Sequence, residues 1–331
     1  MSEITILHLS DLHMDKTHLR DIKIILKAMF DDLKGLKDKD NNDMKPDLVF
    51  FTGDLVNSGS DYNEFKLARD LFIDPLMKDA LNLSENRFFF VPGNHDIDRT
   101  KWNKIAVTGI RTLYTDATKL NEFFDTELNV NQDKYLETLH NFIAFKKSFT
   151  NPYIVESNNL FSVYQLDING VKFGIGCLNS AWLAYGGSND KEELLVCERQ
   201  IHSVLDKMGT CDVKIALMHH PLEWLKEFDR DDVENRLTSN FDLLLTGHMH
   251  KSKPKSFQGP NGSLFYSDGG TLFNGNRKTD YQGYTILKFD PQAKEVNAVY
   301  FRRYIDKFTH FDKDVDRAPD GLWQPNKKKT P

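Results

Sequence analysis

The sequence has few cysteines, no excess of positive charge and no long hydrophobic run. Three cysteines in 331 residues are an odd number without a CxxC pair, which fits packing residues in a reducing compartment better than a disulfide framework. A net charge of -6 excludes a global positive field that would hold nucleic acid or anionic lipid. No run reaches the roughly 18 apolar residues of a membrane span, and the start, MSEITILHLSDLH, lacks the basic region of a signal peptide. We therefore expect a cytoplasmic protein without a membrane partner.

Short apolar runs alternate with longer helical patterns, which indicates an α/β protein whose helices connect the strands of a sheet. Several of the runs end on polar clusters. Open α/β sheets bind ligands at the carboxyl ends of their strands, so this placement points to a functional site. The predicted strands are 4–9, 47–52, 87–91, 160–167, 171–178, 213–218 and 241–246, and the predicted helices are 19–29, 63–77 and 191–207.

Residues 97–150 interrupt the alternation because Phe, Leu, Lys and Asn recur there at helical spacing without an evident strand. We expect a helical insertion that walls one side of the site. Residues 263–303 predict a strand meander, and 312–331 read as a polar tail or linker with lysines at 327–329. We assign residues 1–311 to one domain that contains the insertion.

Five polar clusters carry the chemistry, and each follows a predicted strand. They hold six of the eleven histidines. Carboxylate, imidazole and amide ligands together suit manganese, iron or zinc, so the clusters predict catalytic metal ions. We expect D-x-H and H-x-H each to present two side chains on one side of an extended segment. The clusters are Asp11-Leu12-His13, Gly53-Asp54, Gly93-Asn94-His95-Asp96, His219-His220 and Gly247-His248-Met249-His250.

The order of these clusters resembles the calcineurin-like metallophosphoesterase superfamily, whose pattern D-x-H, G-D, G-N-H-[DE], H, G-H-x-H is matched at every position. The resemblance implies a four-layer αββα sandwich in which two mixed sheets are flanked by helices. It also implies two divalent or mixed-valence metal ions at one edge of the sandwich, bridged by Asp54. The implied ligands are Asp11, His13 and His250 for the first ion, and Asn94, His219 and His248 for the second.

The resemblance extends to residues around the ions. His219 rather than His220 is the implied ligand, because the family's histidine stands two residues before a proline. The nucleophile would be a hydroxide that bridges the ions, and His95 would protonate the departing alkoxide or stabilise phosphoryl charge. His220 and Asp96 are expected to orient the metal-binding side chains without binding an ion themselves. His8 fits that role and strand packing equally well.

Departures from the family's branches narrow the substrate. The phosphoprotein phosphatase branch carries G-D-x-x-D-R-G, whereas residues 53–59 read GDLVNSG, and Met14 stands where that branch has glycine. The stretches 52–59 and 92–96 resemble bacterial class III cyclic-nucleotide and glycerophosphodiester phosphodiesterases, and residues 7–13 resemble the recombination-nuclease branch. The predicted function is a phosphodiesterase that acts on a nucleotide or nucleic acid.

Three alternatives stay open: a nuclease module of a larger protein, a phosphomonoesterase and a non-catalytic scaffold. The scaffold is disfavoured because every motif residue is retained. A nuclease must neutralise several phosphates along a strand, for which Arg277-Lys278 and Arg302-Arg303 are candidates. The insertion could exclude long polymers, or stack bases through Trp102, Tyr114 and Phe123. A small, nucleotide-like phosphate ester is favoured slightly.

Overall fold

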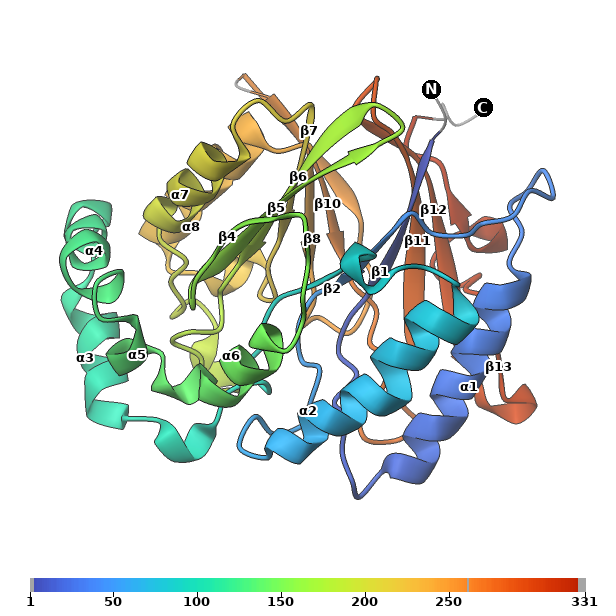
Figure 1. Cartoon of the computed structure of the whole chain (residues 1–331), viewed down its shortest axis with the longest axis horizontal. Coiled ribbons are helices and arrows are strands. Elements are labelled where there is room, and N and C mark those ends of the chain that lie inside the picture. The colour runs from blue at the N-terminus through green and yellow to red at the C-terminus, as the bar shows by residue number, and fades with distance from the viewer. Residues whose placement is uncertain (1–2, 261, 327–331) are drawn as a thin grey trace.

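The computed structural model of the protein describes residues 3–260 and 262–326. Within these residues, two mixed β-sheets lie face to face, and helices cover both outer sides (Figure 1). The predicted four-layer αββα sandwich is thereby confirmed.

The first sheet gathers strands from both ends of the described chain. Its members are β1 (Ile4–Leu9), β2 (Leu48–Phe51), β3 (Phe88–Phe90), β11 (Gly283–Asp290), β12 (Glu295–Ile305), β13 (His310–Lys313) and β14 (Leu322–Trp323). Their order is β13-β12-β11-β1-β2-β3, with β14 beside β12. The strands β1, β2 and β3 are parallel, so their carboxyl ends meet at one edge.

The second sheet gathers strands from the middle of the chain. Its members are β4 (Ile154–Ser157), β5 (Phe161–Ile168), β6 (Val171–Leu178), β7 (Val213–Leu217), β8 (Leu243–Thr246), β9 (Lys255–Gly259) and β10 (Gly262–Asp268). Their order is β4-β5-β6-β7-β8-β10-β9. Because β6, β7 and β8 are parallel, their carboxyl ends also share an edge.

Side chains alternate between the two faces of each strand, so one face builds the core between the sheets. On β1, Ile4 and Ile6 join that inner core with Phe50 of β2, whereas Leu7 and Leu9 pack on the helical side. All six residues of β1, including the polar Thr5 and His8, are therefore buried, as is usual for a central strand that is covered on both faces.

Helices cover each sheet with an apolar stripe. The helix α1 (Leu19–Gly35) buries Ile22, Ile25, Leu26 and Met29, which recur at the spacing of one helical face. It lies beside α2 (Tyr62–Ala68) on the first sheet, while α7 (Glu198–Met208) and α8 (Glu227–Asn240) cover the second (Figure 1). Beyond α2 the chain continues as wider π-helical turns to Ala80, around Pro75, which lacks a backbone N–H.

The helix predicted from residue 191 begins only at Glu198. The buried Asp229 carboxylate accepts the backbone N–H groups of Val196 and Cys197, and Cys197 has a φ of 71°, outside the helical region. The sequence pattern also missed α8, which contributes Asp229. That helix is mostly polar and buries only Asp229, Val233 and Leu237.

The predicted meander over 263–303 is wrong, because β10 pairs with β8 and β9 whereas β11 and β12 belong to the other sheet. Residues of the expected polar tail also differ from a linker: β13 ends at Lys313, and β14 pairs with β12. The lysines at 327–329 lie outside the described residues.

The expected insertion, 97–150, consists of helices and turns. It contains α3 (Lys104–Leu113), α4 (Ala117–Phe123), α5 (Gln132–Tyr135) and α6 (His140–Lys147), which extend to one side of the second sheet (Figure 1). The thiols of Cys177, Cys197 and Cys211 are all free, the first two of them buried. Across the described residues, every helix is too short or too polar to cross a bilayer.

Candidate metal centre

The parallel strand ends of both sheets converge, and backbone hydrogen bonds tie their loops together. The N–H of Asp11 donates to the Gly53 carbonyl, and the N–H of His13 donates to the Asp54 carbonyl, both at 3.0 Å. In the second sheet, the Gly247 N–H donates to the His219 carbonyl at 2.9 Å. Distant stretches of chain are thus fixed at one edge.

One group of side chains surrounds Asp11. Its Oδ1 lies 3.3 Å from His250 Nε2 and 3.8 Å from His13 Nε2. The carboxylate of Asp54 reaches the same place, with Oδ2 4.0 Å from His13 Nε2. Asp11, His13 and His250 can therefore offer three ligand atoms to one cation.

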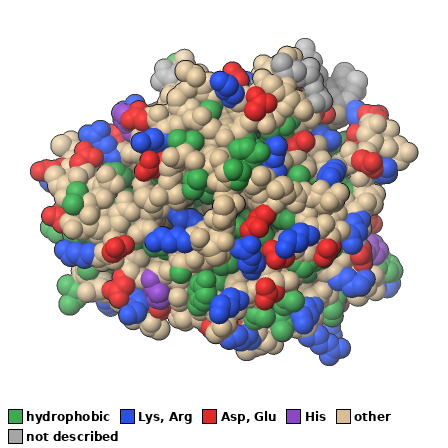
Figure 2. All heavy atoms as spheres, in the orientation of Figure 1, with side chains coloured by type: hydrophobic (Ala, Val, Ile, Leu, Met, Phe, Trp, Pro, Cys, Tyr) green, Lys and Arg blue, Asp and Glu red, His purple; other side chains and the backbone are tan. Residues whose placement is uncertain are grey.

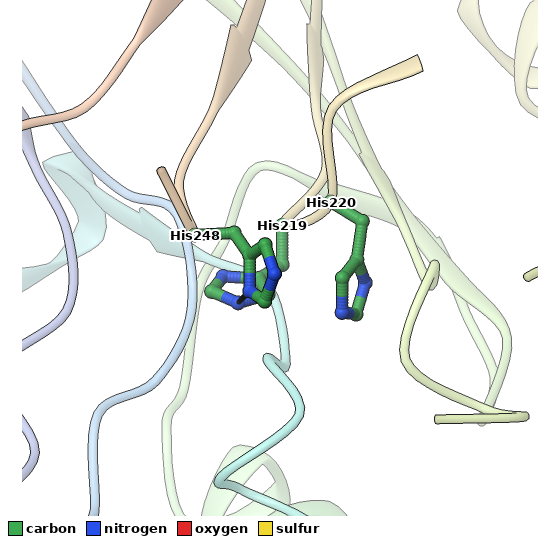
Figure 3. A group of neighbouring side chains, drawn as sticks. All are labelled: His219, His220 and His248. Atoms are coloured by element: carbon green, nitrogen blue, oxygen red, sulfur yellow. Dashed lines mark hydrogen bonds between the residues drawn. The ribbon is translucent and has the colours of Figure 1, made fainter. Parts of the chain in front are cut away.

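A second group surrounds His219. Its Nε2 lies 3.1 Å from Asn94 Oδ1, 3.2 Å from His248 Nδ1 and 3.3 Å from Asp54 Oδ2. Figure 3 shows the His219 and His248 rings next to each other, with the His220 ring set to one side. Since ligands that share a metal typically lie roughly 3 Å apart, the second group also has the spacing of a coordination site.

The backbone at these side chains differs from our expectation. The φ angles are 54° for Asp11, 46° for His13, 56° for Asp54, 68° for His248 and 58° for His250. All five residues have positive φ angles, in the left-handed region of backbone conformation. The prediction that D-x-H and H-x-H lie on extended segments is therefore wrong. Non-glycine residues seldom adopt this region, and such strain concentrates at functional sites.

A glycine allows the closest approach in the site. A Cβ atom at Gly93 would lie 2.2 Å from Asp54 Oδ1 and 2.4 Å from the Asp54 backbone nitrogen. Any other residue would push the Asn94 loop away from the carboxylate. The glycine of the G-N-H motif is therefore required by packing, whatever the identity of the bound ion.

Burial and neighbouring charges favour an ionised Asp11 and neutral rings at His13 and His248, but a protonated ring at His219. Burial would raise the pKa of Asp11, but the neighbouring His250 and His219 lower it to about 2. Burial lowers the pKa of His13 to about 4 and, together with the charge of His219, that of His248 to about 3. For His219 burial acts downward, but the Asp54 carboxylate raises the pKa to about 9.

Unsatisfied polar atoms indicate what the site can hold. Among the buried atoms without a hydrogen-bond partner are Asp11 Oδ1 and both ring nitrogens of His13. Leaving such atoms unpaired costs free energy, on the order of 1–3 kcal/mol each. A cation between them would offset that cost, and the donor set of carboxylate, imidazole and amide suits manganese, iron or zinc.

His95 and Asp96 follow Asn94 and take different positions. The backbone N–H of His95 donates to Asp54 Oδ1 at 2.7 Å, and its ring lies 4.6 Å from the His13 ring. Asp96 is buried and accepts three backbone N–H groups, from Leu55, Val56 and Gly93. His95 thus faces the cluster, and Asp96 holds the loops that carry it.

The remaining predicted residues lie behind the cluster. His8 Nε2 is 3.0 Å from Thr52 Oγ1, and His220 Nδ1 is 3.0 Å from Ser180 Oγ. His220 is also close enough to His219 and His248 to share an ion with them. His219 fits the second group better, because its ring reaches both Asp54 and Asn94.

Several contacting residues had no signal in the sequence. The Thr52 carbonyl lies 2.7 Å from His219 Nδ1, and the Asn57 carbonyl lies 2.9 Å from His95 Nδ1. The rings of Trp224 and His248 are nearly perpendicular, with 4.0 Å between their centroids. Backbone acceptors carry no residue-type signal, so only the position of Thr52 beside Gly53 hinted at its role.

Comparisons with known proteins identify the family of the chain. Residues 4–252 match the calcineurin-like phosphoesterase family. A curated relative, the uncharacterized metallophosphoesterase-like protein YydB of Bacillus subtilis (strain 168), is 23% identical over 259 aligned residues. The match covers 76% of this chain and 49% of YydB. The chain therefore spans about half the length of that relative.

The solved structures to which the chain is similar have low sequence identity and TM-scores below 0.5. A hypothetical protein from Thermus thermophilus is 14% identical with a TM-score of 0.44, over 91% of this chain and 99% of that protein. The sulfate thiohydrolase SoxB of the same species is 12% identical with a TM-score of 0.45, over 92% of this chain and 56% of SoxB. On the match that spans residues 4–252, this chain belongs to the calcineurin-like phosphoesterase family.

Proposed function

We propose that the protein is a phosphodiesterase that depends on two metal ions and hydrolyses a nucleotide-like ester. Asp54 is the proposed bridge between the ions. The proposed ligands are Asp11, His13 and His250 for the first ion and Asn94, His219 and His248 for the second.

The position of the Asp54 carboxylate is the observation that carries this proposal. Its Oδ2 lies between His219, at 3.3 Å, and His13, at 4.0 Å, which belong to the two separate groups. A single carboxylate within reach of both groups is what a bridged pair of ions requires. The unpaired atoms of Asp11 and His13 support the same assignment.

When bound, the two ions supply Lewis acidity to the phosphoryl group and acidify a water molecule as the nucleophile. The residues of the chain contribute orientation and proton transfer. His95 Nδ1 lies 2.9 Å from the Asn57 carbonyl, a contact that suits Nδ1 as a donor and leaves Nε2 for the substrate. His95 is thus the proposed general acid for the leaving alkoxide.

Two features support a diester over a phosphoprotein substrate. Where phosphoprotein phosphatases carry Asp and Arg after G-D, this chain has Asn57 and Ser58, and a backbone carbonyl rather than a carboxylate holds His95. In addition, a cavity of about 650 Å³ opens beside His250 and is lined by Lys251 and Asn274. It offers room for an organic group attached to the phosphate.

A substrate panel tests the proposal. With added manganese, we expect hydrolysis of bis-p-nitrophenyl phosphate and of a 2′,3′-cyclic nucleotide, with kcat/KM for each at least about tenfold above that for p-nitrophenyl phosphate, a difference of roughly 1.4 kcal/mol in transition-state binding. A colorimetric assay of released nitrophenolate and chromatography of the nucleotide measure these rates. Turnover of monoesters alone would refute the diesterase.

The nuclease alternative receives less support. Arg302 is buried and pairs with Asp32, and Arg277 pairs with Asp21 and Asp306, so neither guanidinium is free for phosphate. Figure 2 shows basic and acidic side chains interspersed on the face drawn. Phe123 is buried, and its ring stacks on that of Tyr114 with 4.5 Å between the centroids. The ring of Phe123 is therefore used in packing rather than exposed to a base.

Metal affinity is expected to rise with pH. In the metal-free protein the pKa of His219 is raised to about 9, so the ring is protonated at neutral pH. An ion that binds this imidazole must displace the proton, so the Kd for manganese should increase about tenfold per pH unit as the pH falls below about 9. Calorimetric titrations at about pH 7 and about pH 8 measure the change.

The exposed histidine His202 on α7 provides a control for this titration. The variant His202→Asn should show the same pH dependence as the unchanged protein. A Kd that is independent of pH over this range would contradict the assignment of His219 as a ligand.

A further inference from the structure

Two aromatic side chains and one arginine form a platform beside the metal centre. The rings of Trp102 and Tyr185 lie 4.1 Å apart between centroids, with an angle of 40° between their planes. Tyr185 is 42% exposed, which is unusual for a large ring in this protein. We call Arg99, Trp102 and Tyr185 the aromatic platform.

The platform is held by contacts between the insertion and the loop that follows β6. The buried Asp190 carboxylate accepts the backbone N–H groups of Tyr185 and Gly186. Arg111 of α3 lies 2.7 Å from Asp190 Oδ1 and also donates to the Leu183 carbonyl at 2.7 Å. The loop is therefore fixed by a buried ion pair, and Tyr185 is a rigid feature of the surface.

Arg99 links the platform to the metal centre. Its Nη2 donates to the Asn94 carbonyl at 3.3 Å, and Asn94 Oδ1 is 3.1 Å from His219. A Cβ atom at Gly186 would lie 2.4 Å from Arg99 Nη2, so the guanidinium rests against the backbone next to Tyr185. Arg99 is exposed, and among the described residues its guanidinium donates to the Asn94 carbonyl and pairs with no carboxylate. Its charge is available to an anion.

We propose that the aromatic platform binds the nucleoside part of the substrate: the planar base stacks on Tyr185, and Arg99 donates to oxygens of the adjoining phosphate. This inference rests on the proposed phosphodiesterase function and names its substrate class. Aromatic rings stack on every base, and a guanidinium binds phosphate through parallel N–H donors. The helical insertion then acts in recognition, because it supplies Trp102 and the arginine that fixes the loop.

Two diesters with the same leaving group isolate the platform. Thymidine 5′-(p-nitrophenyl phosphate) carries a base, whereas methyl p-nitrophenyl phosphate does not, and both release nitrophenolate. For Tyr185→Leu and Trp102→Ala we expect the ratio of KM for the thymidine ester to KM for the methyl ester to rise about tenfold, the loss typical of one base-stacking contact. The kcat for the thymidine ester should change by less than about threefold, because stacking acts remote from the reacting atoms.

Matched variants separate stacking from a merely structural role. Tyr185→Phe keeps the ring and should keep the KM ratio, whereas Tyr114→Leu removes a tyrosine of the helical insertion that stacks with Phe123 of the same insertion. The latter should also leave the ratio unchanged. If Tyr185→Leu left the ratio unchanged while methyl p-nitrophenyl phosphate was still hydrolysed, the platform would be refuted and the diesterase would stand.

A binding measurement decides the matter without turnover. Thymidine 5′-monophosphate should quench the tryptophan fluorescence of the metal-free protein, and Tyr185→Leu should raise its Kd about tenfold. Absence of quenching, or equal Kd values in the two proteins, would overturn the platform. Failure to hydrolyse either diester, with nucleotide binding intact, would instead overturn the diesterase and leave the platform as a nucleotide site.

Discussion

Replacing Asp54 by alanine is expected to lower kcat/KM for bis-p-nitrophenyl phosphate by at least about a thousandfold. Its carboxylate lies within 4.0 Å of both His13 and His219, one residue from each ligand group. Loss of the proposed bridge would remove charge stabilisation of several kcal/mol from the transition state, and each 1.4 kcal/mol is a factor of about ten. Steady-state rates in manganese, with the metal content measured on the same sample, test this.

The control for this substitution is Asp206→Ala, which removes an exposed carboxylate from α7. Its rate should match that of the unchanged protein. A variant at Asp54 that kept two bound ions and at least about a tenth of the activity would contradict the bridging role.

Replacing His95 by asparagine is expected to lower kcat by about 10² to 10⁴, with both metal ions retained. Among the described residues, the His95 ring is hydrogen-bonded only to the Asn57 carbonyl, and the backbone N–H of residue 95, which binds Asp54, remains in the variant. A general acid matters most when the leaving group is a poor one. The loss should therefore be larger for a dinucleotide, which releases an alkoxide, than for a nitrophenyl ester.

The prediction for His95 is tested by measuring the metal content of the variant and its kcat for both substrates. His310→Asn, at an exposed residue of β13, should leave both rates unchanged. Equal losses for the alkyl and nitrophenyl esters would argue that His95 stabilises phosphoryl charge instead of donating a proton.

The strand ends were predictable because burial on both faces leaves a mostly apolar run. The predicted ranges 4–9 and 171–178 coincide with β1 and β6, and the polar residues that follow the parallel strands do lie at one edge. The carboxyl ends of parallel strands meet at one edge of their sheet, whatever the details of the sequence. The order of runs and polar clusters is therefore enough to locate the candidate site.

Elements that depend on distant partners were not predictable. The start of α7 is set by Asp229, which lies on a helix whose own pattern is too polar to recognise. Arg302 reads as a surface cation until Asp32 of α1 is placed opposite it. Asp229 and Arg302 are both charged residues that are buried because a hydrogen-bonding partner from a distant part of the chain lies opposite them.

The left-handed backbone at the candidate metal centre has a consequence for the stability of the fold. Five residues in that conformation represent strain on the order of 1–3 kcal/mol each, a sum comparable with the net stability of a whole domain. The two sheets, whose strands clamp these loops, must offset this strain. Packing far from the site therefore helps to determine whether its residues keep their positions.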